Sequence, residues 1–227
     1  MQKSRTIFIG DIHGCYKEFK LLIKKLDIKE FDKVFLVGDI INKGPYSYKV
    51  LNFVYKNRKL YKCVLGNNEV NFLNFLKGNF NKNHKHFKKL KNKIEKHKKY
   101  KLIKYLEELP LYIEEKEYIV LHGGLIPNKK IEDHSIDEIT RLREYNGKLW
   151  YKYYNGNKKI IYGHNALDGL QIREKTIGID SGCVYGKSLT AYILETGEIY
   201  SQNALDIYLN VFKKENFILE KLKKIFK

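Results

Sequence analysis

Short apolar runs recur along this chain, and five of them end at a polar junction that contains glycine. The junctions are Gly10-Asp11-Ile12-His13-Gly14, Gly38-Asp39, Gly66-Asn67-Asn68-Glu69, His122-Gly123-Gly124 and Gly163-His164-Asn165. An apolar run of this kind predicts a buried strand, and the glycines predict a tight loop after it. We therefore expect five strand ends to bring one set of polar side chains to a common rim. The set is Asp11, His13, Asp39, Asn67, His122 and His164.

The first half of the chain alternates expected strands with expected helices. Apolar residues at helical spacing mark a helix over 16–26, Pro45 begins a second helix that runs through Asn57, and a third runs to about Leu76. Alternating strands and helices indicate parallel pairing and an α/β domain. Ligands of such domains gather beyond the carboxyl ends of the strands, which is where the junctions fall.

The second half of the chain reads mainly as strands. They are expected at 111–113, 118–121, 160–162, 176–179, 188–194 and 198–201. Helices are expected over 102–109, ended by Pro110, and over 137–145. We expect these strands to add antiparallel pairs and to form a second sheet stacked on the first.

One domain is expected over 1–203, with a Lys-rich helical insertion at about 81–104 and a basic amphipathic helix over 204–227. A thin apolar stripe in the insertion favours a helix with a solvated basic face over a specific anion site. The insertion also carries three histidines without nearby acidic partners, which favours surface positions over metal ligation; they are His84, His86 and His97. Docking on the domain is the favoured role of the terminal helix, with a membrane-surface role as the alternative.

Length and composition restrict the class of protein. The chain has 227 residues, 43% of them hydrophobic, which suits one domain with a sizeable core. The sequence contains no apolar run of about 18 residues and begins with polar residues that lead into a strand, so we expect a cytoplasmic protein without a transmembrane segment. The three cysteines are odd in number and widely spaced, which indicates core thiols rather than disulfides.

The net charge of +18 comes from 44 Lys and Arg against 26 Asp and Glu. A charge of this sign predicts non-specific attraction of polyanions. Lys, Asn, Ile, Tyr and Phe are all abundant, however, as expected of an AT-rich genome in which Lys is a default surface residue. A selected basic face and this compositional explanation both stay open.

The polar residues at the strand ends are more ligands than one ion needs. They suit two divalent transition metals about 3.5 to 4 Å apart, bridged by one carboxylate and a hydroxide. Such a pair binds phosphoryl oxygens and activates the bridging water for in-line attack, so the reaction it predicts is hydrolysis of a phosphate ester or anhydride. Each junction alone has a structural explanation as a turn or a core histidine, but the ordered set favours a metal centre.

In this order, the five junctions resemble the signature of the calcineurin-like metallophosphoesterases, over roughly residues 7–201. Leu109-Pro110 and Ile179-Asp180-Ser181-Gly182-Cys183-Val184 are similar to stretches of the phosphoprotein phosphatase branch, which includes symmetrical diadenosine tetraphosphate hydrolases and bacterial Ser/Thr phosphatases. The resemblance implies a four-layer α/β/β/α sandwich of two mixed sheets. It also implies that Asp11, His13 and Asp39 hold one metal, and that Asp39, Asn67, His122 and His164 hold the other. The implied ions are two of Mn, Fe, Zn, Co or Ni, with manganese expected to serve in vitro.

The chain departs from the family pattern at the implied catalytic positions. Asn68 stands where relatives have a His that protonates the leaving group, and Asn42 stands where protein phosphatases have the Asp that supports this His. Lys43 replaces an Arg that clamps phosphate, which keeps the charge but loses the bidentate fork. Arg141 and Arg143 lie where relatives supply a second clamp; Arg143 is favoured, and either could be a surface helix residue.

Four functional hypotheses follow. The leading one is a dimetal phosphohydrolase that favours phosphoanhydrides, such as dinucleoside tetraphosphates, or activated phosphomonoesters, with Asp39 and Asn68 at the reacting centre. The second is a protein Ser/Thr phosphatase acting on phosphoproteins. The third is a metal-loaded binding module whose catalysis Asn68 has weakened, and the fourth is a nucleic-acid-binding protein built on the positive charge. The oligomeric state is left open.

Overall fold

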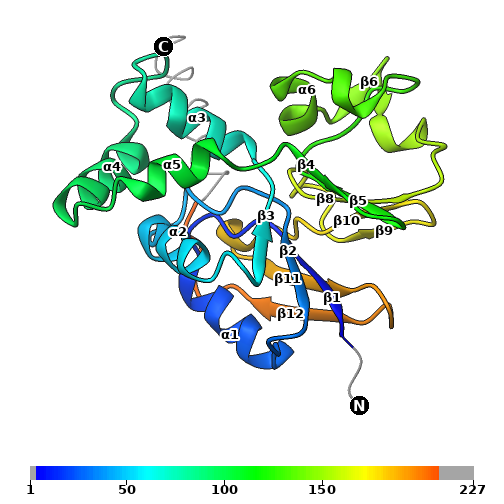
Figure 1. Cartoon of the computed structure of the whole chain (residues 1–227), viewed down its shortest axis with the longest axis horizontal. Helices are drawn as coiled ribbons and strands as arrows, with labels where there is room; N and C mark the ends of the chain where they lie inside the picture. The colour runs from blue at the N-terminus through cyan, green and yellow to red at the C-terminus, as the bar shows by residue number, and fades with distance from the viewer. Residues whose placement is uncertain (1–3, 210–227) are drawn as a thin grey trace, which may run out of the picture.

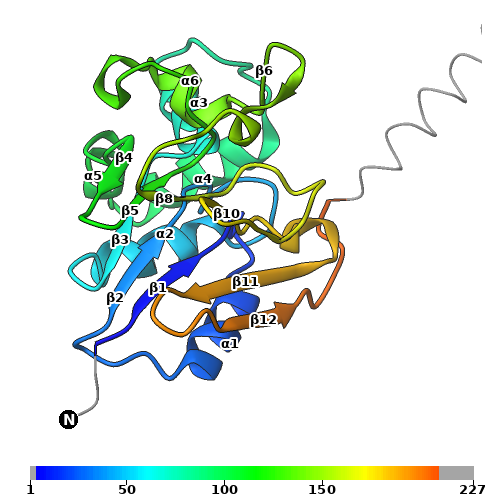
Figure 2. The same ribbon diagram turned by 90° about the vertical axis from the view of Figure 1, so that its right-hand side faces the viewer.

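A computed structural model of the chain describes residues 4–209, in which two five-stranded sheets lie face to face. Figure 2 shows the layers in order, from α6 (Ile136–Arg141) through the second sheet and the first sheet to α1 (Tyr16–Leu26). Both sheets combine parallel and antiparallel pairs. The expected sandwich of two mixed sheets between helices is therefore confirmed.

The first sheet has the strand order β12-β11-β1-β2-β3 (Figure 1). Its strands are β1 (Thr6–Ile9), β2 (Lys33–Leu36), β3 (Tyr61–Cys63), β11 (Ser188–Ile193) and β12 (Ile199–Asn203). The first three pair in parallel through the crossover helices α1 and α2 (Ser47–Lys56). Strand β11 is antiparallel to β1 on its other side, and β12 is antiparallel to β11.

The second sheet has the strand order β4-β5-β8-β10-β9. Its strands are β4 (Tyr112–Glu114), β5 (Tyr118–Leu121), β8 (Lys159–Tyr162), β9 (Gln171–Ile172) and β10 (Thr176–Gly178). The three central strands are parallel and the two edge strands are antiparallel to their neighbours. A separate hairpin follows α6 and consists of β6 (Glu144–Tyr145) and β7 (Lys148–Leu149).

Successive side chains of each strand point to opposite faces of the sheet, which divides the core into layers. In β1, Ile7 and Ile9 pack with the helices, whereas Phe8 packs between the two sheets. This follows from the two-residue period of a strand, which sends neighbouring side chains to opposite faces. On the outer face of the second sheet, Ile139 of α6 and the buried Trp150 complete a third cluster.

The Lys-rich segment contains two helices, α4 (Lys85–Lys96) and α5 (Lys101–Glu107), beside α3 (Asn67–Leu76) (Figure 1). The apolar stripe of α4 is fully buried in the main core; it consists of Phe87, Leu90 and Ile94. His86 and His97 are exposed, and the half-buried His84 accepts a hydrogen bond from the Phe87 N–H at the start of α4. All three cysteines are buried and free, as expected.

Several predicted boundaries are wrong. The last two strands belong to the first sheet, because β11 pairs with β1, and not to the second sheet. The helix expected over 137–145 ends at Arg141, because Asn146-Gly147 forms the turn of the β6-β7 hairpin. The second helix begins at Ser47 rather than Pro45.

The segment 204–209, at the start of the expected terminal helix, is not helical. The remainder of that helix, 210–227, lies outside the described residues. Among residues 4–209, no helix has the length and apolar character needed to cross a membrane.

A buried ion pair fixes the start of the first sheet. Asp32, which is 4% exposed, accepts a hydrogen bond from Arg5 Nη2 at 2.6 Å and from the backbone N–H groups of Arg5 and Lys29 at 3.1 and 2.9 Å. Burial on its own would raise the pKa of Asp32, but these hydrogen bonds hold it below the usual value of 3.8. The ionised carboxylate therefore joins β1 to the loop before β2.

We expect Asp32→Asn to lower the free energy of unfolding by about 1–3 kcal/mol at pH 7, because it leaves buried donors poorly paired. The native pKa of Asp32 lies below its unfolded value, so this contribution is present above about pH 3.8 and is lost as the pH falls through the native pKa. Denaturant unfolding at pH 7 and pH 3 should show a smaller difference from wild type at pH 3. The control is Asp27→Asn, which removes an exposed pair with Lys29. A loss for Asp27→Asn as large as that for Asp32→Asn would contradict the assignment.

Candidate metal centre

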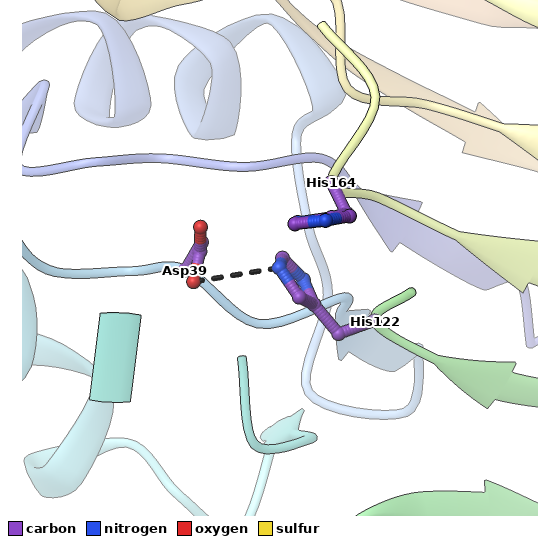
Figure 3. Close-up of side chains that lie close together, drawn as sticks. All are labelled: Asp39, His122 and His164. Atoms are coloured by element: carbon purple, nitrogen blue, oxygen red, sulfur yellow. Dashed lines mark ion pairs between the residues drawn. The ribbon is translucent and has the colours of Figure 1, made fainter. Parts of the chain in front are cut away.

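The carboxyl ends of five strands meet at one place between the two sheets. Asp11 and His13 lie on the loop after β1, and Asp39 lies on the loop after β2. His122 directly follows β5, and His164 lies two residues after the end of β8, both in the second sheet; the two histidines face Asp39 (Figure 3). Because the sheets face each other, loops that are far apart in sequence converge there.

The carboxylate of Asp39 lies at the centre of this group. Its Oδ1 is 3.4 Å from His122 Nε2, and its Oδ2 is 3.6 Å from His13 Nε2. Asp11 Oδ2 is 3.8 Å from the same His13 nitrogen. Asp39 thus belongs to two groups whose ligand atoms lie within 4.8 Å of one another; these are Asp11, His13 and Asp39, and Asp39, His122 and His164.

Asn67 lies with the second of these groups. Its Oδ1 is 3.0 Å from His122 Nε2 and 2.9 Å from His164 Nδ1. It is the first residue of α3 rather than a loop residue, so the helix start directs its side chain to the rim. The structure therefore brings together all the side chains that the strand-end pattern singled out.

The backbone at the centre is strained. His13, Asp39, Asn42, Lys43 and His164 all have positive φ values, between 47° and 73°. Residues other than glycine rarely adopt this conformation, and it persists where surrounding contacts enforce it, often at functional sites. Glycine is required at position 66, where a Cβ atom would collide with the backbone nitrogen of Asp39.

Glu69 holds the loops in place and was not assigned a role from the sequence. It is fully buried, and its carboxylate accepts hydrogen bonds from the backbone N–H groups of Asp39, Ile41 and Gly66 at 2.8, 3.2 and 3.0 Å. Burial, followed by the charge of Asp39, raises the pKa of Glu69 to about 7. The signal available in the sequence was an acid two residues after Asn67, in the first turn of the helix, where its carboxylate can accept from the N–H of the N-cap residue Gly66.

Asp180 is a further acid that the strand-end pattern did not include. It follows β10, is 4% exposed and lines the same cavity as Asp11. Burial raises the pKa of both groups, and their mutual repulsion adds to the rise for Asp11. The sequence signal that could have identified Asp180 was again an apolar run followed by an acid and a glycine, at 176–182.

The histidines differ in their electrostatic environment. Burial would lower the pKa of His122, but Asp39 and then Asp11 raise it to about 10. Burial, aided by Lys43, lowers the pKa of His13 to about 3, and burial with the neighbouring His122 lowers that of His164 to about 2. His13 and His164 are therefore neutral, which is the form that binds metals.

This donor set fits divalent metal ions. It offers carboxylate oxygens, imidazole nitrogens and one amide oxygen, a mixture that suits Mn, Fe, Zn, Co or Ni and does not select among them. Asp39 is the shared member of the two groups.

The two amides that replace a His and an Asp of the family pattern contact each other. Asn42 Nδ2 donates to Asn68 Oδ1 at 2.5 Å, and Asn68 Nδ2 donates to Asp39 Oδ2. Asn42 Oδ1 is buried and has no hydrogen-bond partner among the described residues. Neither amide titrates, so the pair keeps a fixed hydrogen-bonded geometry but cannot act as a general acid.

The predicted cationic residues separate into two groups. Lys43 Nζ is 2.9 Å from His13 Nε2 and Arg143 donates to the His164 carbonyl oxygen at 3.0 Å, and both side chains line the cavity. Burial would lower the pKa of Lys43, but the charge of Asp39 outweighs it and the pKa is raised. Arg141 lies apart from the cavity lining, because its guanidinium is paired with Asp137 and Asn71 at 2.7 Å.

The metal-ligand groups open into a cavity of about 500 Å³. Lys43 and Arg143 lie beside its floor, which consists of Asp11, His13, Asp39, Asn67, Asn68, His164 and Asp180. Tyr185 and Lys187 also line the cavity, and Lys43 Nζ lies 5.2 Å from the centre of the Tyr185 ring. A phosphorylated molecule could therefore meet ligand atoms and cations at once.

Two facing mixed sheets with acids, histidines and an amide at their strand ends are the arrangement of a metal-dependent phosphoesterase. The family model of the calcineurin-like phosphoesterases matches residues 4–209, and the chain belongs to this family. The family expected from the five junctions is thus confirmed, and with it a hydrolase.

Similar proteins include enzymes named for one class of nucleotide. The chain is 31% identical to the asymmetrical bis(5'-nucleosyl)-tetraphosphatase PrpE of Oceanobacillus iheyensis, over 94% of each chain. It is 27% identical to the symmetrical bis(5'-nucleosyl)-tetraphosphatase of Buchnera aphidicola, over 86% of this chain and 96% of the other. A crystal structure described as a candidate diadenosine tetraphosphatase has a TM-score of 0.74 at 29% identity, and covers 89% of this chain and 95% of its own.

A structure of a yeast protein serine/threonine phosphatase is similar in fold alone. It has a TM-score of 0.61 at 18% identity, and covers 89% of this chain and 81% of its own. This likeness supports the two-sheet architecture and leaves the substrate open.

We expect Asp39→Asn to reduce the manganese bound by purified protein from about two ions per chain to one or fewer, because Asp39 is the ligand shared by both groups. Elemental analysis after manganese loading and desalting measures this, with circular dichroism to show that the fold persists. Asp137→Asn, which changes an exposed acid paired with Arg141, should keep the wild-type content. Unchanged metal content in Asp39→Asn would show that the ions bind elsewhere.

We expect Glu69→Ala to lower the free energy of unfolding by about 2–4 kcal/mol, because three buried N–H groups lose their acceptor. Denaturant unfolding measures the change. Glu132→Ala, at an exposed acid, should alter the free energy of unfolding by less than about 0.5 kcal/mol. Equal stability of the two variants would remove Glu69 from its assigned role.

Proposed function

We propose that this protein is a dimetal phosphohydrolase that cleaves phosphoanhydride bonds in dinucleoside polyphosphates. The observation that carries the proposal is the Asp39 carboxylate, which belongs to two metal-ligand groups at the floor of a cavity that also holds cationic side chains. The names of the similar tetraphosphatases, of both the asymmetrical and the symmetrical kind, support the same class of substrate.

In this proposal the ligands divide between two ions. Asp11, His13 and Asp39 would hold the first ion, and Asp39 would also contribute to the second. The remaining ligands of the second ion would be Asn67, His122 and His164. When bound, two divalent cations supply Lewis acidity toward phosphoryl oxygens and lower the pKa of a water molecule.

The cationic side chains bind and orient the phosphate chain. Lys43 carries its charge at the cavity floor, since its pKa is raised above the usual value. Arg143 presents its guanidinium at the side of the cavity from a bond to the His164 carbonyl. Lys43 contacts His13 and Arg143 contacts His164, so the two cations lie beside different ligand groups. This arrangement suits a chain of several phosphates, whose charge is spread along its length.

The neutral amide pair determines which leaving group is tolerated. Asn68 occupies the position next to Asp39 but supplies no titratable proton, and Asn42 supplies none to Asn68. General acid catalysis contributes about 10² to 10⁴ in rate where the leaving oxygen is strongly basic. A serine alkoxide is such a group, whereas a nucleotide phosphate leaves as a weakly basic anion. The site therefore favours anhydrides over the protein phosphatase alternative.

We expect manganese-loaded enzyme to hydrolyse diadenosine tetraphosphate and an aryl phosphate at least about 10²-fold faster than a phosphoserine peptide, because only the peptide requires a proton for its leaving group. Initial rates at one pH measure the ratio. Turnover of phosphoserine equal to that of the tetraphosphate would overturn the proposal. Activity that survives in Asp39→Asn would show that a different site is responsible.

We expect Asn68→His combined with Asn42→Asp to raise turnover of the phosphoserine peptide by about tenfold or more, with a smaller change for the tetraphosphate, because the pair then contains a proton donor. The matched control is Asn71→His, which places a histidine on the same helix outside the cavity lining. A gain of equal size on both substrates would contradict this explanation.

Chromatography of the products of tetraphosphate hydrolysis distinguishes the two modes of cleavage. Asymmetrical cleavage gives AMP with ATP, and symmetrical cleavage gives two molecules of ADP.

A further inference from the structure

The mouth of the metal cavity has an apolar side that the proposed chemistry does not use. Ala166 and Leu167 lie on the loop after β8, and Ile207 and Leu209 lie on the segment after β12. Leu167 is 85% exposed and Ile207 is 58% exposed. Exposed apolar side chains that lie together and are rimmed by polar residues often mark a ligand-binding groove.

The segment 204–209, which we name the strap, is held in place by a buried acid. Glu18 in the first turn of α1 is fully buried, and its Oε1 accepts hydrogen bonds from the Leu205 N–H at 3.0 Å and the Tyr208 hydroxyl at 2.7 Å. Burial, followed by the bond to Glu18, raises the pKa of Tyr208, so its hydroxyl stays a donor. The first helix after the metal-ligand loop thus anchors the strap.

Backbone contacts fix the strap at both ends. Ala204 N–H donates to the Lys187 carbonyl at 2.8 Å, and Leu209 N–H donates to the Val184 carbonyl at 2.9 Å. Between them Ile207 packs over Gly186, where a Cβ atom would lie 2.7 Å from Ile207 Cγ1. Gly186 also has a φ of 88°, so glycine is required there both for its conformation and for the close approach of Ile207.

The two segments that form the apolar side of the mouth are joined to each other. Lys187 Nζ donates to the Ala166 carbonyl at 3.2 Å, which links the loop after β8 to the turn beneath the strap. Leu167 and Ile207 therefore belong to one connected rim rather than to two free loops. A connected rim loses little conformational entropy when a ligand binds against it.

We propose that this rim is a nucleoside-binding wall, in which Ile207 and Leu167 contact the base of a nucleotide whose phosphates occupy the cationic floor, and that Glu18 is the positioning residue that holds it. The inference rests on the proposed function and adds a specificity element to the same cavity. A nucleotide combines a flat apolar base with an anionic chain, which matches an apolar rim beside Lys43 and Arg143. Inorganic polyphosphate has the anionic chain but no base.

Competitive inhibition tests the wall with a nucleotide and its inorganic counterpart. In aryl phosphate hydrolysis by the manganese-loaded enzyme, the inhibition constants of ADP and of pyrophosphate are measured for each variant. For Ile207→Ser we expect the ratio of the ADP constant to the pyrophosphate constant to rise at least about fivefold, because only ADP carries a base. The control is Leu205→Ser, a residue of the same strap that is 54% exposed and does not line the cavity. An unchanged ratio for Ile207→Ser, or an equal rise for Leu205→Ser, would overturn the proposal.

The role of Glu18 is tested by two substitutions. Glu18→Gln keeps an oxygen that can accept from Leu205 and Tyr208, so we expect it to retain a ratio within about twofold of wild type. Glu18→Ala removes the acceptor, and we expect the ratio to rise as for Ile207→Ser. A general structural defect would change both inhibition constants together. If Glu18→Ala does not fold, the Ile207 comparison still decides whether the wall binds the base, and a rise of the ratio in Glu18→Gln equal to that of Ile207→Ser would reject the role of Glu18.

This experiment separates the wall from the proposed function. Failure of wild-type enzyme to hydrolyse diadenosine tetraphosphate would reject the proposed substrate, whereas the ratio of the two inhibition constants is measured on an aryl phosphate. A wild-type enzyme that binds ADP no better than pyrophosphate would reject the wall alone.

Discussion

The structure depends on one carboxylate that must stay ionised while fully enclosed. Asp39 is 2% exposed, and its pKa lies below its usual value because His122, His13 and Lys43 offset the cost of burial. The backbone N–H of Asn68 also donates to Asp39 Oδ1 at 2.8 Å. Such a group is stable only when every neighbour is in place, so the loops of both sheets are constrained by the same charge.

Much of the centre could be predicted because its signals are local. A strand end followed by glycine and an acid or histidine can be read from a few consecutive residues, as at Gly38-Asp39 and His122-Gly123. The parallel crossovers then fix which ends of the strands meet. The apolar runs and the glycine-containing loops that end them were enough to place the ligands at one rim.

The features that were missed depend on contacts between distant residues. Strand β11 was assigned to the wrong sheet because its pairing with β1 spans nearly the whole described chain. The buried bonds of Glu18 to Leu205 and Tyr208 leave no trace near Glu18 in the sequence. The β6-β7 hairpin is different, since Asn146-Gly147 was a readable turn signal that the apolar spacing of 137–145 obscured.

The pairing of β1 with β11 has a consequence for how the protein matures. Residues 6–9 leave the ribosome early, but their antiparallel partner at 188–193 is made only near the end of the described chain. His164 is also synthesised late, so a nascent chain carries the first ligands long before the last one exists. The second ligand group can therefore be completed only after residue 164 has been made, and a chain cut short before residue 188 exposes an unpaired edge of β1 as a site for aggregation.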